Sequence, residues 1–235
     1  EAAADTPVAP EPEPVATEYE GETLSAMRRT IARNLSQSWA EIPHVTVWRS
    51  VEATRVLAAR KETGLSLEAI LVKAVLPALA EFREFNARFD VSTLQRSDAA
   101  HVGIAVDTQA GLMVPVVRDA ETMNLRELTD EIERLTTAAR ERTLGLGELS
   151  GGTFTVSNVG AVGGGFGTPI IPYGTTSIVS IGRAEDDVVV RNKAIAVAPV
   201  FSVSLSFDHR IIDGAMASRF LLAYAMEIER YRLAH

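Results

Sequence analysis

The chain has 235 residues, a net charge of −8 and a composition that is 46% hydrophobic, which is enough to bury the core of one large domain. The acidic balance gives no electrostatic basis for binding nucleic acid or anionic lipid, and no apolar run approaches the roughly 20 residues of a membrane helix, so we expect no nucleic acid and no membrane partner. The absence of cysteine excludes disulfides, thiolate metal sites and a cysteine nucleophile, which leaves any reacting thiol to the substrate.

The first 20 residues differ in composition from the rest of the chain. Residues 1–20 contain four of the ten prolines, several Ala and Glu residues and almost no large apolar side chains. Such a segment cannot offset its ordering entropy by burial, so we expect a flexible linker at 1–20 and one folded domain at 21–235. Because the chain begins with Glu1 and not with Met, we expect further domains upstream.

The first half of the folded domain predicts three helices and one strand. Residues 23–41 place apolar side chains at helical spacing and end before a proline, which indicates an amphipathic helix. Residues 44–52 alternate in β-type residues and predict a strand, and residues 53–61 predict a short helix. Residues 66–85 predict an apolar, buried helix with Ser66 as its N-cap.

The middle of the chain predicts a hairpin and a surface helix. Two β-type runs, 101–108 and 111–119, are separated by a gap of turn length, so we expect a hairpin or a sharp corner. Residues 125–142 are apolar on one side and charged on the other, which is typical of a surface helix. We expect the two glycines at 145 and 147 to end it.

The last third predicts four strands and a final helix. The strands are expected at 152–160, 176–183, 187–191 and 194–208, and the helix at 214–232. Asp213 stands at the N-cap position of that helix. Because helices and strands interleave but hairpins are frequent, we predict an α/β (α+β two-layer) fold with a mixed β-sheet covered by helices, and not a regular parallel wheel.

His209 is the first candidate for chemistry, because it lies between a long strand and a helix, where rigid neighbours hold an exposed side chain. An imidazole can take a proton from a thiol near neutral pH and so generate the attacking thiolate. The structural alternative is a strand-end histidine bonded to a nearby carbonyl. Asp213, four residues later, is close enough to orient a side chain, to hold an arginine or to cap the helix. Arg210 is assigned an ion pair and no catalytic role.

Two weaker signals indicate no separate site. The glycine-rich stretch at 160–169 lacks both the G-K-[ST] ending and the G-x-G-x-x-G pattern of phosphate-binding loops, so we expect a flexible or closely packed loop. His44, His101 and His235 are scattered and are not accompanied by spaced carboxylates. We therefore expect no metal site.

Six segments resemble one known family in the same order along the chain. DHRIIDGAMASRF (208–220) resembles the D-H-R-x-x-D-G signature of the acyltransferase core of 2-oxo acid dehydrogenase complexes. The other five are MRRTIARNL (27–35), IPHVT (42–46), FNARFD (85–90), VGIAVDTQAGLMVPVVRDA (102–120) and GGTFTVSNVGAVGGGFGTPII (151–171). Together they cover roughly residues 22–231. The proline-rich segment 1–20 also resembles the linkers that join lipoyl-bearing and subunit-binding domains to this core.

The resemblance implies a chloramphenicol acetyltransferase-like fold and an acyltransferase catalytic domain at 21–235. Its reaction moves an acyl group between coenzyme A and the dihydrolipoyl group of a lipoyl domain absent from this chain. His209 is implied as general base, Asp213 as a residue that holds the site, and Ser157 as the donor to the tetrahedral oxyanion. The residues implied along the coenzyme A path are Arg60, Ser66, Asp107, Asn158 and Gly182. Each has a structural alternative, such as helix capping or turn formation.

The resemblance also implies partners. The family forms homotrimers whose active-site channel runs between subunits, so His209 is expected to complete a site built mostly by a neighbouring chain. Expected partners are the decarboxylase and dihydrolipoamide dehydrogenase components of the complex, in the cytoplasm, or in the mitochondrial matrix of a eukaryote. The sequence departs from the family pattern at PYGTTSI (172–178) and IERYRLAH (228–235), which leaves acyl preference and assembly into a larger core open. The motifs favour acetyl or branched-chain groups over succinyl.

Two alternatives to this function remain. A small-molecule O-acetyltransferase would share the fold, but the linker-like segment and the D-H-R context count against it. A non-catalytic oligomeric scaffold would not need His209, Asp213 and Ser157 together.

Overall fold

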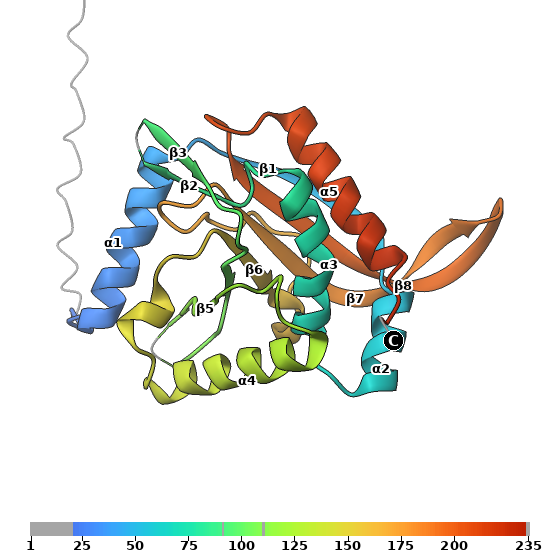
Figure 1. Cartoon of the computed structure of the whole chain (residues 1–235), viewed down its shortest axis with the longest axis horizontal. Coiled ribbons are helices and arrows are strands. Elements are labelled where there is room, and N and C mark those ends of the chain that lie inside the picture. The colour runs from blue at the N-terminus through green and yellow to red at the C-terminus, as the bar shows by residue number, and fades with distance from the viewer. Residues whose placement is uncertain (1–20, 91, 110, 234–235) are drawn as a thin grey trace, which may run out of the picture.

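A six-stranded sheet forms the centre of the domain in a computed structural model that describes residues 21–90, 92–109 and 111–233 (Figure 1). The predicted linker at 1–20 lies outside the described residues. The strands follow one another across the sheet as β1 (His44–Glu52), β8 (Ala194–Asp208), β7 (Ser177–Arg191), β6 (Phe154–Asn158), β4 (Val102–Ile104) and β5 (Val116–Val117).

The sheet is mixed, as the sequence predicts. β4, β6 and β7 run parallel to one another, whereas β8 is antiparallel to both β7 and β1, and β5 is antiparallel to β4. The expected hairpin between residues 101 and 119 is confirmed by the β4–β5 pair, although both strands are shorter than predicted. These directions place the carboxyl ends of β4, β6 and β7 at one edge of the sheet and that of β8 at the opposite edge.

The sequence predicts one strand too many in the last third of the chain. The two strands expected at 176–183 and 187–191 form the single strand β7, which continues through a register shift between Ile181 and Ala184. A β-bulge of this kind lets a strand bend without ending. Asn192 and Lys193 then turn the chain with positive φ angles of 52° and 66°. The ends of β7 and β8 beyond the sheet form an arm that projects from the body (Figure 1).

Within the described residues, five α-helices cover or flank this sheet. They are α1 (Ala26–Glu41), α2 (Thr54–Thr63), α3 (Leu67–Glu81), α4 (Leu125–Glu141) and α5 (Gly214–Glu229). Figure 1 shows α3 and α5 in front of the sheet and α1 beside its edge. Eight residues of α3 are buried, which confirms the apolar helix predicted there. The ring of Phe220 on α5 stacks on Phe85 with centroids 4.1 Å apart and lies near Phe154 of β6, so aromatic contacts join the two layers.

The sequence predicted where helices begin more accurately than where they end. Ser66 and Asp213 are N-caps, as predicted, and accept hydrogen bonds from the backbone N–H groups of Ala69 and Met216. α3 ends at Glu81 and not at residue 85, because Phe82 leaves helical geometry and packs edge-on against Phe85 and Phe220. α4 ends before the two glycines expected to stop it, since Arg142 itself takes the left-handed conformation.

A second, two-stranded sheet has no clear sequence signal. It pairs β2 (Ala87–Asp90) with β3 (Thr93–Arg96). Both strands are short and largely polar, so they lack the apolar alternation by which strands are recognised. Two 3₁₀ helices, η1 (Leu146–Leu149) and η2 (Val159–Val162), complete the described elements.

The two faces of the main sheet differ in chemistry. Alternate residues of β8 point to opposite faces, so Val203, Leu205 and Phe207 join the core beneath the helices. The intervening Ser202, Ser204 and Ser206 face the other side. The same face carries Thr46, Trp48 and Ser50 of β1, which pair in register with these serines. We call this side the serine face of the sheet.

The glycine-rich stretch at 160–169 packs closely against β7 and the serine face. The backbone N–H of Gly167 donates to Ser204 Oγ (3.1 Å), and the Trp48 indole donates to the Gly167 carbonyl (2.9 Å). Gly182 of β7 lies directly beneath this stretch: a Cβ there would overlap Ser202 Oγ and lie 2.9 Å from the Gly164 carbonyl oxygen. The closely packed alternative predicted for this loop is therefore the one observed.

The close packing predicts that Gly182→Ala destabilises the domain. The added methyl group has no space, and overpacking of this kind costs about 1–3 kcal/mol. We expect a lower free energy of unfolding in urea denaturation. Gly147→Ala is the matched control, because nothing lies within 4 Å of its Cβ position. Equal stability of the two variants would contradict the packing described here.

Candidate active site

His209 lies immediately after β8, at the edge of the sheet where β7 begins. Its backbone N–H donates to the Pro43 carbonyl (3.1 Å), and its exposed ring lies 5.8 Å from the ring of Phe207. The other described histidines have structural partners: the Ile171 N–H donates to His44 Nε2, and the Asp119 N–H donates to His101 Nδ1. Among the described histidines, only the imidazole of His209 has both nitrogens available to a substrate.

The two residues beside His209 form a charge pair that fixes its backbone. The Asp208 carboxylate is fully buried and accepts two hydrogen bonds from Arg210 Nε and one from Arg210 Nη2, at 2.6–3.1 Å. Asp208 Oδ1 also accepts from the Arg210 backbone N–H (3.0 Å). Removing the partner of a buried charge is strongly destabilising, because the charge is left uncompensated away from water. Since Asp208 and Arg210 hold each other across His209, the histidine has little freedom to change its backbone conformation.

Arg210 also connects this turn to the neighbouring elements. Its guanidinium lies 4.8 Å from the centroid of the Phe89 ring on β2. The hydrogen bonds that Arg210 donates to Asp208 raise the pKa of Arg210. Nearby, the Tyr173 hydroxyl donates to Glu41 Oε2 at the end of α1, which lowers the pKa of Glu41 and raises that of Tyr173. The departure from the family pattern at 172–178 thus places Tyr173 in contact with α1.

Asp213 has the capping role that its position predicts. Its Oδ1 accepts from the Met216 N–H (2.7 Å) at the start of α5. The expectation that it could hold an arginine is not met by Arg210, which pairs with Asp208 instead because Asp208 is the buried carboxylate.

The second group of predicted site residues meets at the opposite edge of the sheet. Ser157 and Asn158 end β6 there, and Asn158 Nδ2 donates to Glu68 Oε1 (2.6 Å) in the first turn of α3. The other oxygen of Glu68 accepts from the hydroxyl of Ser66 (2.9 Å), the N-cap of that helix. Ser66 and Asn158 are therefore joined through Glu68, a residue that no sequence motif described above includes.

The remaining predicted coenzyme A residues lie at the same edge. Gly182 follows Ile181, which pairs with Asn158. Asp107 is exposed just beyond β4, which runs parallel to β6. Arg60 is exposed in the last turn of α2, which leads into α3. The carboxyl ends of parallel strands meet at one edge of a sheet and commonly form ligand sites.

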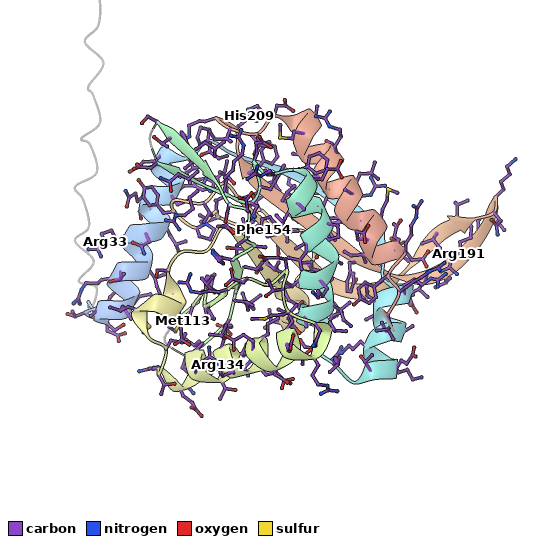
Figure 2. The ribbon with its side chains drawn as sticks, viewed as in Figure 1. Arg33, Met113, Arg134, Phe154, Arg191 and His209 are labelled. Atoms are coloured by element: carbon purple, nitrogen blue, oxygen red, sulfur yellow. The ribbon has the colours of Figure 1, made fainter. Side chains whose placement is uncertain are left out.

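The hydroxyl of Ser157 and the imidazole of His209 are far apart within one chain. Ser157 pairs with Ser180 on β7, and Ser180 pairs with Ser204 on β8, which amounts to two strand spacings or roughly 10 Å. His209 lies five residues beyond Ser204, which adds roughly 16 Å along the strand. Figure 2 shows His209 at the upper edge of the view, above Phe154 at the start of β6. The predicted site residues of one chain therefore form two separate groups, which we call the histidine half-site at the β8 end and the serine half-site at the β6 end.

Metal and membrane features are absent from the part of the chain that the structure describes. No group of three or more His, Cys, Asp or Glu residues is arranged there to hold a metal ion. Within the same residues, no helix combines the length and apolar composition needed to cross a membrane.

Comparison with known proteins identifies relatives over almost the whole chain. The family profile described as 2-oxoacid dehydrogenases acyltransferase (catalytic domain) matches residues 16–235. The dihydrolipoyllysine-residue acetyltransferase component of the pyruvate dehydrogenase complex of Bacillus subtilis is 38% identical over 211 residues, which cover 85% of this chain and 48% of that protein. The same component of Staphylococcus aureus is 36% identical and covers 92% of this chain and 53% of that protein. The chain thus spans about half the length of these curated relatives.

Solved structures match the fold. A probable dihydrolipoamide acetyltransferase from Listeria monocytogenes has a TM-score of 0.85 at 29% identity, covering 92% of this chain and 98% of that chain. Dihydrolipoamide acetyltransferase from Azotobacter vinelandii, solved to examine one serine, one histidine and one asparagine in its catalytic mechanism, has a TM-score of 0.86 at 31% identity, covering 95% and 97%. A chloramphenicol acetyltransferase at 16% identity, covering 84% of this chain and 92% of that one, has a TM-score of 0.53 and shares the fold alone. The predicted fold class is confirmed.

The burial of Asp208 predicts a large cost for removing its partner. Arg210→Gln leaves a buried carboxylate without a cation, so we expect the free energy of unfolding to fall by about 3 kcal/mol in urea denaturation. Combining it with Asp208→Asn removes the stranded charge, and we expect the double variant to regain part of that loss.

The matched control is Arg96→Gln, which breaks the ion pair with Glu84. Those side chains are 44% and 24% exposed, so we expect a loss below about 1 kcal/mol. Similar losses for Arg96→Gln and Arg210→Gln would contradict the special position of the Asp208 pair.

Proposed function

Because the chain belongs to the acyltransferase catalytic-domain family of 2-oxo acid dehydrogenases, we propose that it transfers an acetyl group between coenzyme A and the dihydrolipoyl group of a lipoyl domain. The observation that carries the proposal is the presence of two half-sites at opposite edges of one sheet. One offers an exposed imidazole, and the other offers a hydroxyl beside residues suited to a polar ligand. The lipoyl group would be carried by another domain.

The spacing of the proposed catalytic residues supports this function. In the Azotobacter vinelandii enzyme, the serine and the histidine are fifty-two positions apart and the asparagine follows the histidine by four. Ser157, His209 and Asp213 have the same spacings here. Asparagine and aspartate differ in charge but are both strong N-caps. The property they share is an oxygen that accepts a hydrogen bond, which agrees with the capping role of Asp213 at the start of α5.

The proposed reaction is a reversible exchange of thioesters. The thiol of one substrate gives its proton to the His209 imidazole while its sulfur attacks the carbonyl carbon of the other substrate's thioester. A carbon–sulfur bond forms and the π electron pair moves to oxygen, giving a tetrahedral oxyanion. When the carbonyl re-forms, the original carbon–sulfur bond breaks and the leaving thiolate takes the proton from the imidazolium. Both sulfur atoms come from the substrates, which fits a chain without cysteine.

Ser157 is proposed as a donor to that oxyanion. Its hydroxyl lies at the end of a strand held on both sides by parallel neighbours, and it forms no hydrogen bond among the described residues. A fixed donor directed at developing negative charge stabilises the transition state, and its removal costs about 10²–10³ in rate. Asp208 and Arg210 are proposed to position His209 for the proton transfer.

The separation of the half-sites favours an active site shared between two copies of the chain. A thioester carbonyl cannot contact Ser157 and His209 of one chain when they lie roughly 19 Å apart. The serine face, moreover, carries the exposed apolar side chain of Trp48 (53%), and Phe166 of the glycine-rich stretch that packs on this face is 56% exposed. We propose that a second copy covers this face and brings its His209 to the first copy's Ser157. A cyclic trimer provides three such sites.

Coenzyme A is proposed to bind at the serine half-site. Arg60 is exposed and forms no ion pair within the described residues, so its charge is available to a phosphate group. Ser66, Asp107 and Asn158 would supply polar contacts along the edge. Gly182 would contribute through its packing under the glycine-rich stretch, which shapes the floor of the half-site.

A subunit-mixing experiment tests the shared site. We expect His209→Ala and Ser157→Ala homotrimers each to lose at least about 10²-fold in acetyl transfer from acetyl-coenzyme A to dihydrolipoamide. When the two variants are unfolded together and refolded as mixed trimers, about one quarter of the interfaces pair an intact histidine with an intact serine. Activity near that fraction of the wild-type rate is the expected result.

The control is each variant taken alone through the same unfolding and refolding. If both catalytic groups acted within one chain, the mixture would remain as inactive as its components, which would overturn the shared site. A wild-type chain that assembles but transfers no acyl group would instead favour the scaffold alternative.

A panel of thioesters tests the acyl group. The curated relatives are acetyltransferases of pyruvate dehydrogenase complexes, so we expect acetyl-coenzyme A to have the highest kcat/KM, with isobutyryl- and succinyl-coenzyme A lower. Initial rates with free dihydrolipoamide measure the order. A preference for isobutyryl would support the branched-chain reading of the sequence motifs. Transfer to chloramphenicol but not to dihydrolipoamide would support the O-acetyltransferase alternative.

A further inference from the structure

We infer that Ser180 is a second catalytic hydroxyl, which donates to the same oxyanion as Ser157. The inference rests on the acyl transfer proposed above and extends it to a residue outside every sequence motif described. It is carried by the strand register and by the hydrogen bonds of the serine face.

The register places Ser180 directly beside Ser157. The two residues are Cα partners in the parallel pairing of β6 with β7. Neighbouring strands are about 4.8 Å apart, and residues paired in register point to the same face of a sheet. Val156 and Val179, which precede them in the two strands, both join the core beneath the helices. Ser157 and Ser180 therefore face the other side together, about 5 Å apart.

The hydroxyl of Ser180 has no partner in the described structure. Ser180 is 4% exposed, and its side chain forms no hydrogen bond with the described residues. Its Oγ is not among the fully enclosed side-chain atoms that lack a partner, so it keeps a small accessible surface through which it can donate to a ligand. An unpaired hydroxyl beside a second unpaired hydroxyl indicates that a ligand atom occupies the space between them during function.

Along β8, the serines of this face are engaged in hydrogen bonds or enclosed, unlike the pair of Ser157 and Ser180. Ser206 Oγ and Thr46 Oγ1 bond to each other at 2.8 Å. Ser204 Oγ accepts from the Gly167 N–H. Ser202 is unpaired as well, but its oxygen is enclosed against Gly182 beneath the glycine-rich stretch, where a substrate has no access. Ser157 is partly exposed, so a substrate can reach the pair from its side.

Two donors suit the charge that develops in the reaction. The oxyanion has three lone pairs once the carbonyl π electrons reach oxygen, and it accepts a hydrogen bond from each hydroxyl. Neither serine loses its proton, since the proton removed from the thiol is held by the imidazole of the other subunit. Because the two strands fix both side chains before the substrate arrives, little reorganisation accompanies formation of the charge.

Ser180→Ala in the assembled protein tests the inference. We expect kcat for acetyl transfer to fall about 10-fold or more, with KM for acetyl-coenzyme A and for dihydrolipoamide nearly unchanged, because the hydroxyl acts only on the transition state. The thermal unfolding midpoint is expected to stay the same or rise, since no hydrogen bond of the folded protein is lost. Loss of activity without loss of stability is the signature that a merely structural serine would not give.

Ser206→Ala is the matched control on the same face. Ser206 is equally buried, at 1% exposure, but its hydroxyl bonds to Thr46. We expect this variant to lower the unfolding midpoint and to leave kcat within about 2-fold of wild type. An unchanged kcat in Ser180→Ala, or a fall shared equally by Ser206→Ala, would overturn the inference.

The double variant Ser157→Ala/Ser180→Ala shows whether both hydroxyls act on one oxygen. Donors to the same oxyanion form one unit, so we expect the combined loss in kcat to differ from the product of the single losses. If Ser157→Ala abolishes transfer and Ser180→Ala has no effect, the inference fails while the proposed function stands. If the wild-type assembly transfers no acyl group, the proposed function itself fails.

Discussion

The antiparallel pairing of β7 with β8 is the constraint on which the proposed activity depends. Because β8 reverses the direction of β4, β6 and β7, the chain delivers His209 to one edge of the sheet and Ser157 to the other. Neither edge alone has both groups that acyl transfer needs. A rigid sheet cannot fold back on itself to bring them together, so the proposed chemistry requires a second copy of the same surface. In the proposed mechanism, assembly and catalysis are thereby coupled through a single feature of the topology.

The same sheet separates stability from function by its two faces. The side under α3 and α5 is filled with Val, Leu, Ile and Phe side chains and carries the aromatic stack of Phe85 on Phe220, where loss of one large ring would cost about 3–5 kcal/mol. The serine face contributes little apolar burial within one chain. It instead presents hydroxyls at fixed spacing, which is what a site for a short-lived charge requires. Along one strand, alternate side chains thus pack in the core or face the proposed site.

The turn that holds His209 shows how much local structure supports one exposed side chain. Asp208 and Arg210 pair across it, and Asp213 caps the helix that follows. A buried ion pair is a weak source of net stability, since desolvation offsets much of its attraction. Its value here lies in geometry: the backbone on both sides of His209 is fixed, and Arg210 connects that turn to Phe89 of the smaller sheet. An imidazole held in this way can receive a proton without first being ordered by the substrate.

Much of the local structure followed from sequence alone. The helix starts at Ser66 and Asp213 are set by a hydrogen bond between the capping side chain and the backbone of the next turn. His209 likewise belongs to a motif of adjacent residues. Both features can therefore be predicted from residues that are close together in the sequence. The pairing of Ser157 with Ser180 and the separation of Ser157 from His209 cannot be predicted from residues that are close together in the sequence. Strand order and register arise from packing among segments far apart in the chain, and the short polar strands of the smaller sheet exist only because they pair with each other. Sequence therefore indicated the candidate catalytic groups, whereas only the tertiary structure decided that one chain holds them apart.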